Sequence, residues 1–264
     1  MGRKFISFIL FILINKLSFT QILSVDREIK RDSLKNDALI LDLFFSGAKI
    51  KGDLITLKGK LEYDHFFDND YFIMCLGTIK SLVNGNEIIQ NNGYFQMRFR
   101  DDDTRPISPD GFAQYQWNGL QGMDYRALSG GNLRFRWFDK EKNDLYSSIG
   151  LFYEREKWNP LANAYAFDLI DSSIVIRNIF RLNLSSKFAV KFNKFVDFAG
   201  LSYLQFPINE NYLSPRWFLD LSLNLSLNDH IGFVVSYNHN YDTYTALPID
   251  KYFYSMSMGV RIRY

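Results

Sequence analysis

Apolar and polar residues alternate with a period of two through much of this chain. The alternation is clearest in YFYSMSMGVRIRY (252–264), where aromatic and aliphatic side chains share one face while hydroxyl groups and arginines share the other. The segments WFLDLSLNLSLND (217–229) and DLITLKGKLEYD (53–64) repeat the pattern. Because successive side chains of a β-strand point to opposite faces, this period predicts strands with one apolar and one polar face.

The same pattern predicts about twelve strands and no amphipathic helix. Most of these segments are longer than the strands of soluble proteins, which average about five or six residues. A tilted strand that crosses a bilayer needs about 9–11 residues, so strand length favours a barrel in lipid. The predicted strands are 37–47, 52–66, 70–83, 88–100, 110–118, 123–138, 144–156, 173–185, 187–203, 215–227, 230–243 and 250–264.

The two faces of these strands require different surroundings. Leu219, Leu221 and Leu223 cannot all face water, so their side meets lipid or a protein core. Lys58 and Glu62 stand on the opposite face of their strand and cannot line a dry core. We therefore predict an all-β fold: a transmembrane antiparallel up-and-down β-barrel of about 12 strands. Its last strand is expected to pair with the first, because an open sheet edge is not tolerated in lipid.

Prolines and connection lengths fit such a barrel. Every proline is expected between strands or at a strand's first residue, where no ladder hydrogen bond is needed. Outer-membrane barrels have short periplasmic turns and longer extracellular loops, and an even strand number places both termini in the periplasm. The nine-residue stretch 101–109 is an exception on the short side. The short connections are predicted at 67–69, 139–143, 186 and 228–229.

The N-terminus has the layout of a secretory signal peptide. Arg3 and Lys4 precede an apolar run from Phe5 to Ile14, and Ser18–Phe19–Thr20 offers a small–x–small cleavage site. The apolar run is too short to span a membrane as a helix, and an amphipathic or buried helix is the alternative. We predict a signal peptide over residues 1–20, a periplasmic extension over 21–36 and the barrel over 37–264.

Charge and cysteine content exclude some classes of partner. The chain has 31 basic and 29 acidic residues, and removing Arg3, Lys4 and Lys16 with the signal peptide leaves 28 basic residues and a formal charge of −1. This balance gives no reason to expect a nucleic-acid partner. Cys75 is the single cysteine, so the chain forms no intramolecular disulfide and no cysteine-based zinc cluster.

The final residues GVRIRY resemble the C-terminal sorting signal of bacterial outer-membrane barrels. The resemblance rests on Gly259, Val260 and Ile262 and on the terminal aromatic residue Tyr264. It implies a location in the outer membrane of a Gram-negative cell, with outer-membrane lipid and the barrel-assembly machinery as partners.

Two longer stretches carry a resemblance to a family. QYQWNGLQGMDYRALSGGNLRF (114–135) and SSIGLFYEREKW (147–158) resemble the YdiY-like, salt-induced outer-membrane proteins, whose domain has no known function. FFSGAKIKGD (44–53) is similar to that family's first hairpin but lacks some of the polar residues that usually follow the glycine. The resemblance implies the barrel fold and supplies no catalytic motif.

Candidate catalytic and metal-binding residues are few. His239 lies near the predicted extracellular rim with Ser236 and Asp242 nearby, but Ser236 is expected on the opposite face and no hydrolase signature surrounds the histidine. The run Asp101–Asp103 is interpreted as a solvated turn rather than a cation site. We expect no catalytic residue, no metal and no cofactor.

The polar face of the barrel carries most of the candidate chemistry. Its basic residues either pair with acids such as Glu154, Glu156 and Asp220 in a packed interior or line a basic pore for anions, since arginine and lysine rings favour anions. A barrel of about twelve strands lies between filled small barrels and open porins, so size does not decide. The predicted lumen-lining arginines, on a possible anion path, are Arg98, Arg100, Arg126, Arg134, Arg136, Arg177, Arg181, Arg261 and Arg263.

These observations predict a non-enzymatic outer-membrane envelope protein, either structural or a narrow channel for small solutes, anions among them. One alternative is an outer-membrane enzyme that acts on lipid or peptide at the extracellular rim. Another is a binding subunit that uses the loop EKWNPLANAYAFDLIDSS (156–173).

Overall fold

A computed structural model describes most of the predicted barrel. The described residues are 37–49, 53–67, 71–84, 87–101, 105–140, 143–160, 173–208, 214–247 and 251–263. The predicted signal peptide and the extension over 21–36 lie outside this set, as do Tyr264 and most of the 156–173 loop.

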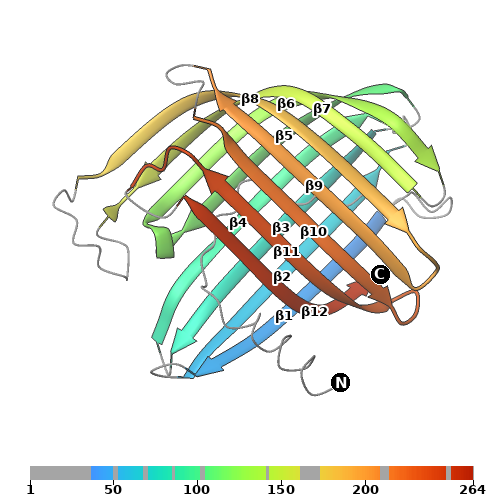
Figure 1. Ribbon diagram of the computed structural model, residues 1–264, viewed down its shortest axis with the longest axis horizontal. Coiled ribbons are helices and arrows are strands. Elements are labelled where there is room, and N and C mark those ends of the chain that lie inside the picture. The colour runs from blue at the N-terminus through green and yellow to red at the C-terminus, as the bar shows by residue number, and fades with distance from the viewer. Residues whose placement is uncertain are drawn as a thin grey trace, which may run out of the picture.

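In the described residues, twelve strands form a closed antiparallel barrel in which each strand pairs with its neighbours in sequence and β1 pairs with β12. Figure 1 shows the strands running obliquely across the barrel wall. The predicted fold class is therefore confirmed. The strands are β1 (Asp37–Lys49), β2 (Asp53–Phe66), β3 (Tyr71–Asn84), β4 (Glu87–Asp101), β5 (Ile107–Asn118), β6 (Met123–Lys140), β7 (Asn143–Trp158), β8 (Val175–Lys191), β9 (Val196–Pro207), β10 (Arg216–Ser226), β11 (Ile231–Asp242) and β12 (Tyr252–Arg263).

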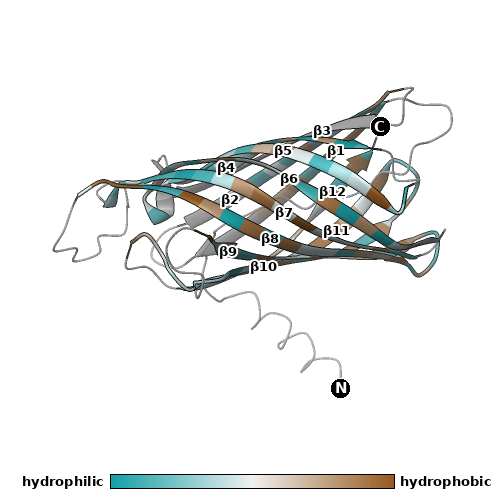
Figure 2. Cartoon of the chain, turned by 90° about the horizontal axis from the view of Figure 1, so that it is seen from above, coloured by the Kyte–Doolittle hydropathy of each residue, from teal (hydrophilic) through white to brown (hydrophobic). Residues whose placement is uncertain are grey.

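Alternation along the strands separates an apolar exterior from a polar interior. In β12, Met256 and Met258 are exposed while Arg261 on the other face is buried. Figure 2 shows the same contrast as alternating brown and teal bands along the strands. Residues that would be surface groups in a soluble protein, such as Glu62 and Gln96, are wholly buried here. The apolar exterior is the face that meets lipid in an outer-membrane β-barrel. Among the described residues, no helix is both long enough and apolar enough to cross a membrane.

Connections lie at two ends of the barrel. We call the end with 67–70, 102–106, 141–142, 192–195 and 227–230 the terminal end, because Asp37 and Arg263 also lie there. The opposite end, the loop end, carries 50–52, 85–86, 119–122, 159–174, 208–215 and 243–251. Only the last three of these connections are long. The predicted difference in length between the connections of the two ends is therefore found for three of the six connections at the loop end. The exceptional stretch 101–109 shrinks to 102–106, because β5 already begins at Ile107.

The predicted turn at residue 186 is wrong. β8 continues through this position to Lys191, and the chain reverses over 192–195. The side chain of Asn193 accepts hydrogen bonds from the backbone amides of Phe195 and Val196, at 2.8 and 3.0 Å, and so forms the turn. Lys194, which falls within the predicted strand 187–203, lies in this turn.

Two prolines also differ from prediction. Pro109 lies inside β5 and Pro207 is the last residue of β9. Pro109 is paired only with Leu133 of β6, since the pairing of β5 with β4 stops at Asp110. A strand end with one free side tolerates a residue that cannot donate a backbone hydrogen bond.

Candidate functional site in the lumen

The predicted arginines all stand on inward-facing positions, and the structure distributes them among separate groups rather than one ring. Arg98, Arg100 and Arg134 lie toward the terminal end, whereas Arg126, Arg177 and Arg181 lie toward the loop end. Arg261 belongs to the β1–β12 seam. Of the nine, only Arg136, Arg177 and Arg263 are more than slightly exposed.

The loop-end group is a buried charge network built on Glu154 and Glu156 of β7, both wholly buried. Arg126 Nε donates to Glu156 Oε1 at 2.8 Å, and Arg181 Nε donates to Glu154 Oε1 at 2.5 Å. Since β7 lies between β6 and β8, each glutamate reaches an arginine from a neighbouring strand. Removing one partner of such a pair would leave a buried charge uncompensated.

Arg216 of β10 joins this network from farther around the barrel. Its guanidinium group donates to Glu154 and Glu156 at 3.2 Å each, and its Nε donates to Asp242 of β11 at 2.9 Å. The strand β10 is three strands away from β7, so these contacts cross the lumen. The Glu156 carboxylate also accepts from Trp158 Nε1 at 2.8 Å. The network therefore occupies the part of the interior between β6 and β11 at this level.

An apolar cap covers the network at the loop end. Met123, Trp158 and Leu247 are nearly fully buried and pack together, with Ala246 against them. Leu247 belongs to the 243–251 connection, so part of that connection folds over the barrel mouth. Gly122 makes the turn beneath it with a φ of 76°, a conformation that favours glycine. Its carbonyl accepts from Asn159 N at 2.7 Å.

A hydrogen-bonded bridge crosses the lumen of the barrel. Arg98 of β4 donates through Nη1 to Asp110 at 2.7 Å and through Nη2 to the hydroxyl of Tyr203 at 3.3 Å. Its guanidinium carbon lies 5.3 Å from the ring centre of Phe112. Tyr203 belongs to β9, which is five strands from β4 in the twelve-stranded ring, so Arg98 joins nearly opposite walls.

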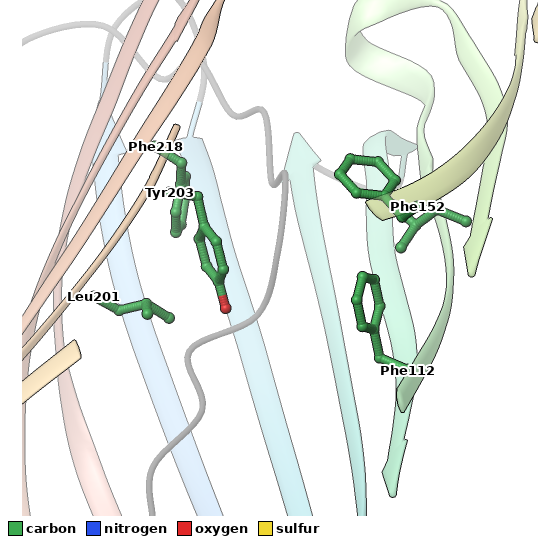
Figure 3. Close-up of a cluster of buried hydrophobic side chains, with 6 residues drawn as sticks. Phe112, Phe152, Leu201, Tyr203 and Phe218 are labelled. Carbon is green, nitrogen blue, oxygen red and sulfur yellow. The ribbon is translucent and has the colours of Figure 1, made fainter. Parts of the chain in front are cut away.

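An apolar cluster surrounds this bridge. Figure 3 shows Leu201, Tyr203 and Phe218 on one wall facing Phe112 and Phe152 on the other. Leu128 completes the cluster, and all six side chains are buried. Phe218 therefore packs inside the barrel, whereas its neighbour Trp217 faces outward.

A pocket lies on the terminal-end side of the bridge. It contains about 310 Å³ of space between atoms, part of it open to solvent. Arg134 stacks on the ring of Tyr146 with its guanidinium carbon 4.6 Å from the ring centre, and the hydroxyls of Ser148 and Ser185 lie 2.6 Å apart. The lining residues are Arg98, Arg100, Asp110, Arg134, Tyr146, Ser147, Ser148, Ser185, Lys187, Leu201 and Tyr203.

The seam between β1 and β12 has its own ion pair. Arg261 donates to both carboxylate oxygens of Asp42 at 2.6 Å and to Asn224 of β10 at 2.7 Å, and both charged side chains are almost fully buried. Arg263 donates to Ser226 at 3.2 Å. A bidentate pair of this kind fixes the relative position of the two strands.

The residues of the predicted assembly signal have distinct environments. Val260 and Ile262 are exposed on the apolar exterior. Gly259 faces inward, and a Cβ atom there would collide with the ring of Phe44 and the carbonyl of Leu43. Glycine therefore allows β12 to approach β1 at this position.

The candidate catalytic residues are not brought together. His239 lies on the outer face of β11 with its ring 5.1 Å from that of Trp217 and 6.3 Å from that of Tyr252. Ser236 stands on the inward face, and Asp242 is bonded to Arg216. The described residues hold no group of three or more potential metal ligands. Asp101, expected in a solvated turn, is instead buried and paired with Arg105 at 2.8 Å, while Asp102 and Asp103 lie outside the described residues.

Sequence reasoning missed several residues that organise the lumen, namely Arg216, Asp42, Asp110 and Tyr203. Arg216 lies on the same face of β10 as Asp220, Ser222 and Asn224 and could have been found by extending the alternation by two further positions on that face. Asp42 could have been found in the same way on β1. Tyr203 had no such signal. Because the turn was wrongly predicted at residue 186, the sequence did not show which residues of the next strand face inward.

Comparisons with known proteins give a family and a set of similar folds. The sequence profile described as "Protein of unknown function, DUF481" matches residues 83–260. No curated protein sequence matches the chain significantly.

Several solved structures resemble the fold. A NanC porin structure has a TM-score of 0.44 at 10% identity, over 86% of this chain and 97% of that one. The translocator domain of the autotransporter NalP from Neisseria meningitidis has a TM-score of 0.46 at 9% identity, over 87% and 88%. A KdgM porin in complex with disordered oligogalacturonate has a TM-score of 0.42 at 10% identity, over 86% and 98%.

Proposed function

Since the chain belongs to the DUF481 family, whose description names no activity, we propose a function from the barrel itself: a non-enzymatic outer-membrane envelope protein with a closed lumen. In this proposal the protein is a structural component of the envelope rather than an open pore. Both termini face the periplasm, and the C-terminal residues are read by the barrel-assembly machinery. The narrower likeness to YdiY-like proteins remains a prediction.

The observation that carries the proposal is the cross-lumen bridge. A solute moving along the barrel axis has to pass the level at which Arg98 touches Tyr203 and Phe112 together. The buried side chains of the apolar cluster occupy the space beside it on the walls made by β5, β6, β7, β9 and β10. A filled interior is typical of narrow barrels, whereas wide porins keep an aqueous channel.

The loop-end network and its cap support the same reading. Arg216 donates across the lumen to two glutamates, and Leu247 packs with Met123 and Trp158 at the mouth. Paired buried charges of this kind resist rearrangement, because separating the two partners leaves each charge buried without compensation, which costs free energy.

The narrow-channel alternative has one observation in its favour. Cationic side chains line the terminal-end pocket, and basic walls select anions in pores. This alternative requires the bridge to open. The enzymatic alternative has less support, because His239 and Ser236 stand on opposite faces of one strand.

Single-channel recording of the refolded protein in a planar bilayer tests the proposal. We expect no steady conductance from the wild-type barrel. Tyr203→Ala removes one side of the bridge and is expected to introduce conductance events. Tyr237→Ala removes the same side chain from the outer face and is the matched control. A steady wild-type current at low voltage would overturn the closed lumen.

A further inference from the structure

The seam between β1 and β12 is paired over only part of its length. Within the described residues the pairing ends at Phe44 and Gly259, although β1 continues to Lys49 and β12 already begins at Tyr252. Both strands keep their other neighbour there, since β2 and β11 pair along these stretches. Figure 1 shows β1 (blue) and β12 (red) separating toward the loop end. We call this part of the wall, between 45–49 and 252–258, the lateral opening.

Side chains at the lateral opening are more exposed than those along the paired seam. Phe45 and Met258 would face each other if the register continued, and they are 67% and 66% exposed. Val260 and Ile262 stand on the same face of β12 beside the paired stretch and are 39% and 42% exposed. The higher exposure fits the lack of a neighbouring strand across the seam.

The lateral opening lies at membrane depth. Tyr252 stacks on Tyr241 with ring centres 4.5 Å apart, at the margin of the apolar exterior where outer-membrane barrels carry an aromatic girdle. Met256 and Met258 lie between this pair and the paired seam, so the free edge of β12 crosses the apolar band. A free strand edge is tolerated at this depth where it borders protein or a water-filled cavity.

The inner side of the lateral opening is polar and accessible. Ser255 and Ser257 face inward on β12 and are half-buried, as is Ser236, the partner of Ser257 on β11. Arg261, beside the paired stretch, is buried instead. These hydroxyl groups give the free edge a border that water can reach. The lateral opening therefore joins lipid on the outside to a polar space on the inside.

A cation stands at the closed end of the lateral opening. Lys58 of β2 is opposite Phe44 in the β1–β2 pairing, and its Nζ lies 4.9 Å from the centre of the Phe44 ring. That ring in turn lies against Gly259, where a Cβ atom would come within 2.6 Å of it. Asp42 and Asp220 attract the ammonium group. Since an ammonium group has three donors, it can bind a further anionic group in addition.

We propose that the lateral opening binds a single-chain amphiphile with a carboxylate head group, a fatty acid from the surrounding membrane. Phe45, Met256 and Met258 continue the lipid-facing exterior to the edge of the opening and suit the hydrocarbon chain. Lys58 suits the carboxylate, because hydrogen bonds between ionised partners are stronger than neutral ones. The site lies in the wall of the barrel rather than across its axis, so it does not depend on the closed lumen.

Cysteine pairs in a refolded Cys75→Ser barrel test the opening itself. Leu43→Cys/Val260→Cys occupies paired positions of the seam and is expected to form an intramolecular disulfide on mild oxidation. Gly47→Cys/Met256→Cys extends the same register to the opening and is expected to stay reduced, because a disulfide needs Cα atoms within about 7 Å. Equal oxidation of the two pairs would overturn the opening. A disulfide-linked dimer would assign the free edges to a second copy of the chain and overturn the fatty-acid site.

A photoreactive fatty acid tests the ligand, with the barrel in phosphatidylcholine nanodiscs. Mass spectrometry is expected to locate saturable labelling at the lateral opening, blocked by excess oleate and not by methyl oleate, whose head group carries no charge. Lys58→Met is expected to lower this labelling by about tenfold or more, whereas Lys58→Arg keeps it. Labelling spread evenly around the exterior would overturn the site, as would unchanged labelling in Lys58→Met or equal competition by methyl oleate.

Lys60→Met is the matched control. It removes the same side chain from the same face of β2 at a position where Lys60 pairs with Glu62 at 3.1 Å, beside the closed part of the seam. Heat-modifiable electrophoretic mobility verifies that each variant has folded. An equal loss of labelling in Lys60→Met would overturn the role of Lys58. A barrel that conducts but still takes up the fatty acid at the lateral opening overturns the closed lumen alone, whereas a closed barrel without labelling overturns this site alone.

Discussion

At the scale of single residues, the interior of this barrel depends on charge pairs that the membrane-facing exterior shields from water. Asp42 and Arg261 show this most directly, because both side chains are 2% exposed and they meet at two oxygen–nitrogen contacts of 2.6 Å. Loss of one partner from a buried pair costs about 3–5 kcal/mol, whereas replacing both with apolar groups is far milder.

Arg261→Met should therefore lower the free energy of unfolding by about 3 kcal/mol or more, because it leaves the Asp42 carboxylate buried without its main partner. The double variant Asp42→Leu/Arg261→Met should recover most of that loss. Urea unfolding of the refolded protein in lipid vesicles measures both. Equal destabilisation by the single and the double variant would contradict the pairing.

At the scale of elements, sequence alternation predicted where the strands are but not where all of them end. It succeeded where the two faces differ strongly, as in β10 and β12, whose leucines and methionines oppose polar residues. It failed around residues 186–196, because β8 and β9 both carry mixed faces there and the polar run SSK resembles a turn. The deciding feature was the side chain of Asn193, whose hydrogen bonds depend on the folded turn.

Ser186→Pro separates these two interpretations. Ser186 lies within β8, paired with Ser147 of β7 and Ser202 of β9, so proline there removes a ladder donor in the middle of the sheet. We expect the variant to fail to give the heat-modifiable folded band. Lys194→Pro lies within the turn over 192–195 and is the comparison, expected to keep that band. A folded Ser186→Pro barrel would contradict the strand assignment.

At the scale of the whole molecule, the closed barrel and its polar interior followed from the sequence, but the division of the interior into levels did not. Alternation places a residue inside or outside; it does not say which residues on distant strands meet. The contact of Arg98 with Tyr203 joins positions 105 residues apart and depends on the shape of the ring. For the same reason the nine arginines were predicted as one lining, whereas the structure separates them into groups.

Deletion of Tyr264 tests the assembly reading of the C-terminus at this scale. Because the terminal residue belongs to the predicted sorting signal and Arg261 and Arg263 to the interior, we expect the deletion to reduce membrane insertion in cells. Refolding of the purified variant in detergent should remain possible. Quantification of the folded band in outer-membrane fractions measures the effect. Normal insertion without Tyr264 would contradict the sorting-signal prediction.

The seam described above also has a consequence for the order of folding events. β1 pairs with β12 from Ile40–Arg263 to Phe44–Gly259 only, whereas β1 pairs with β2 along its whole length. The ion pair at this seam joins residues 219 positions apart. Closing so long a chain segment carries the largest entropy cost of any contact in the ring, and few backbone pairs reward it. The hairpins should therefore form first, and closure of the ring at this short seam should be the final and slowest step of folding.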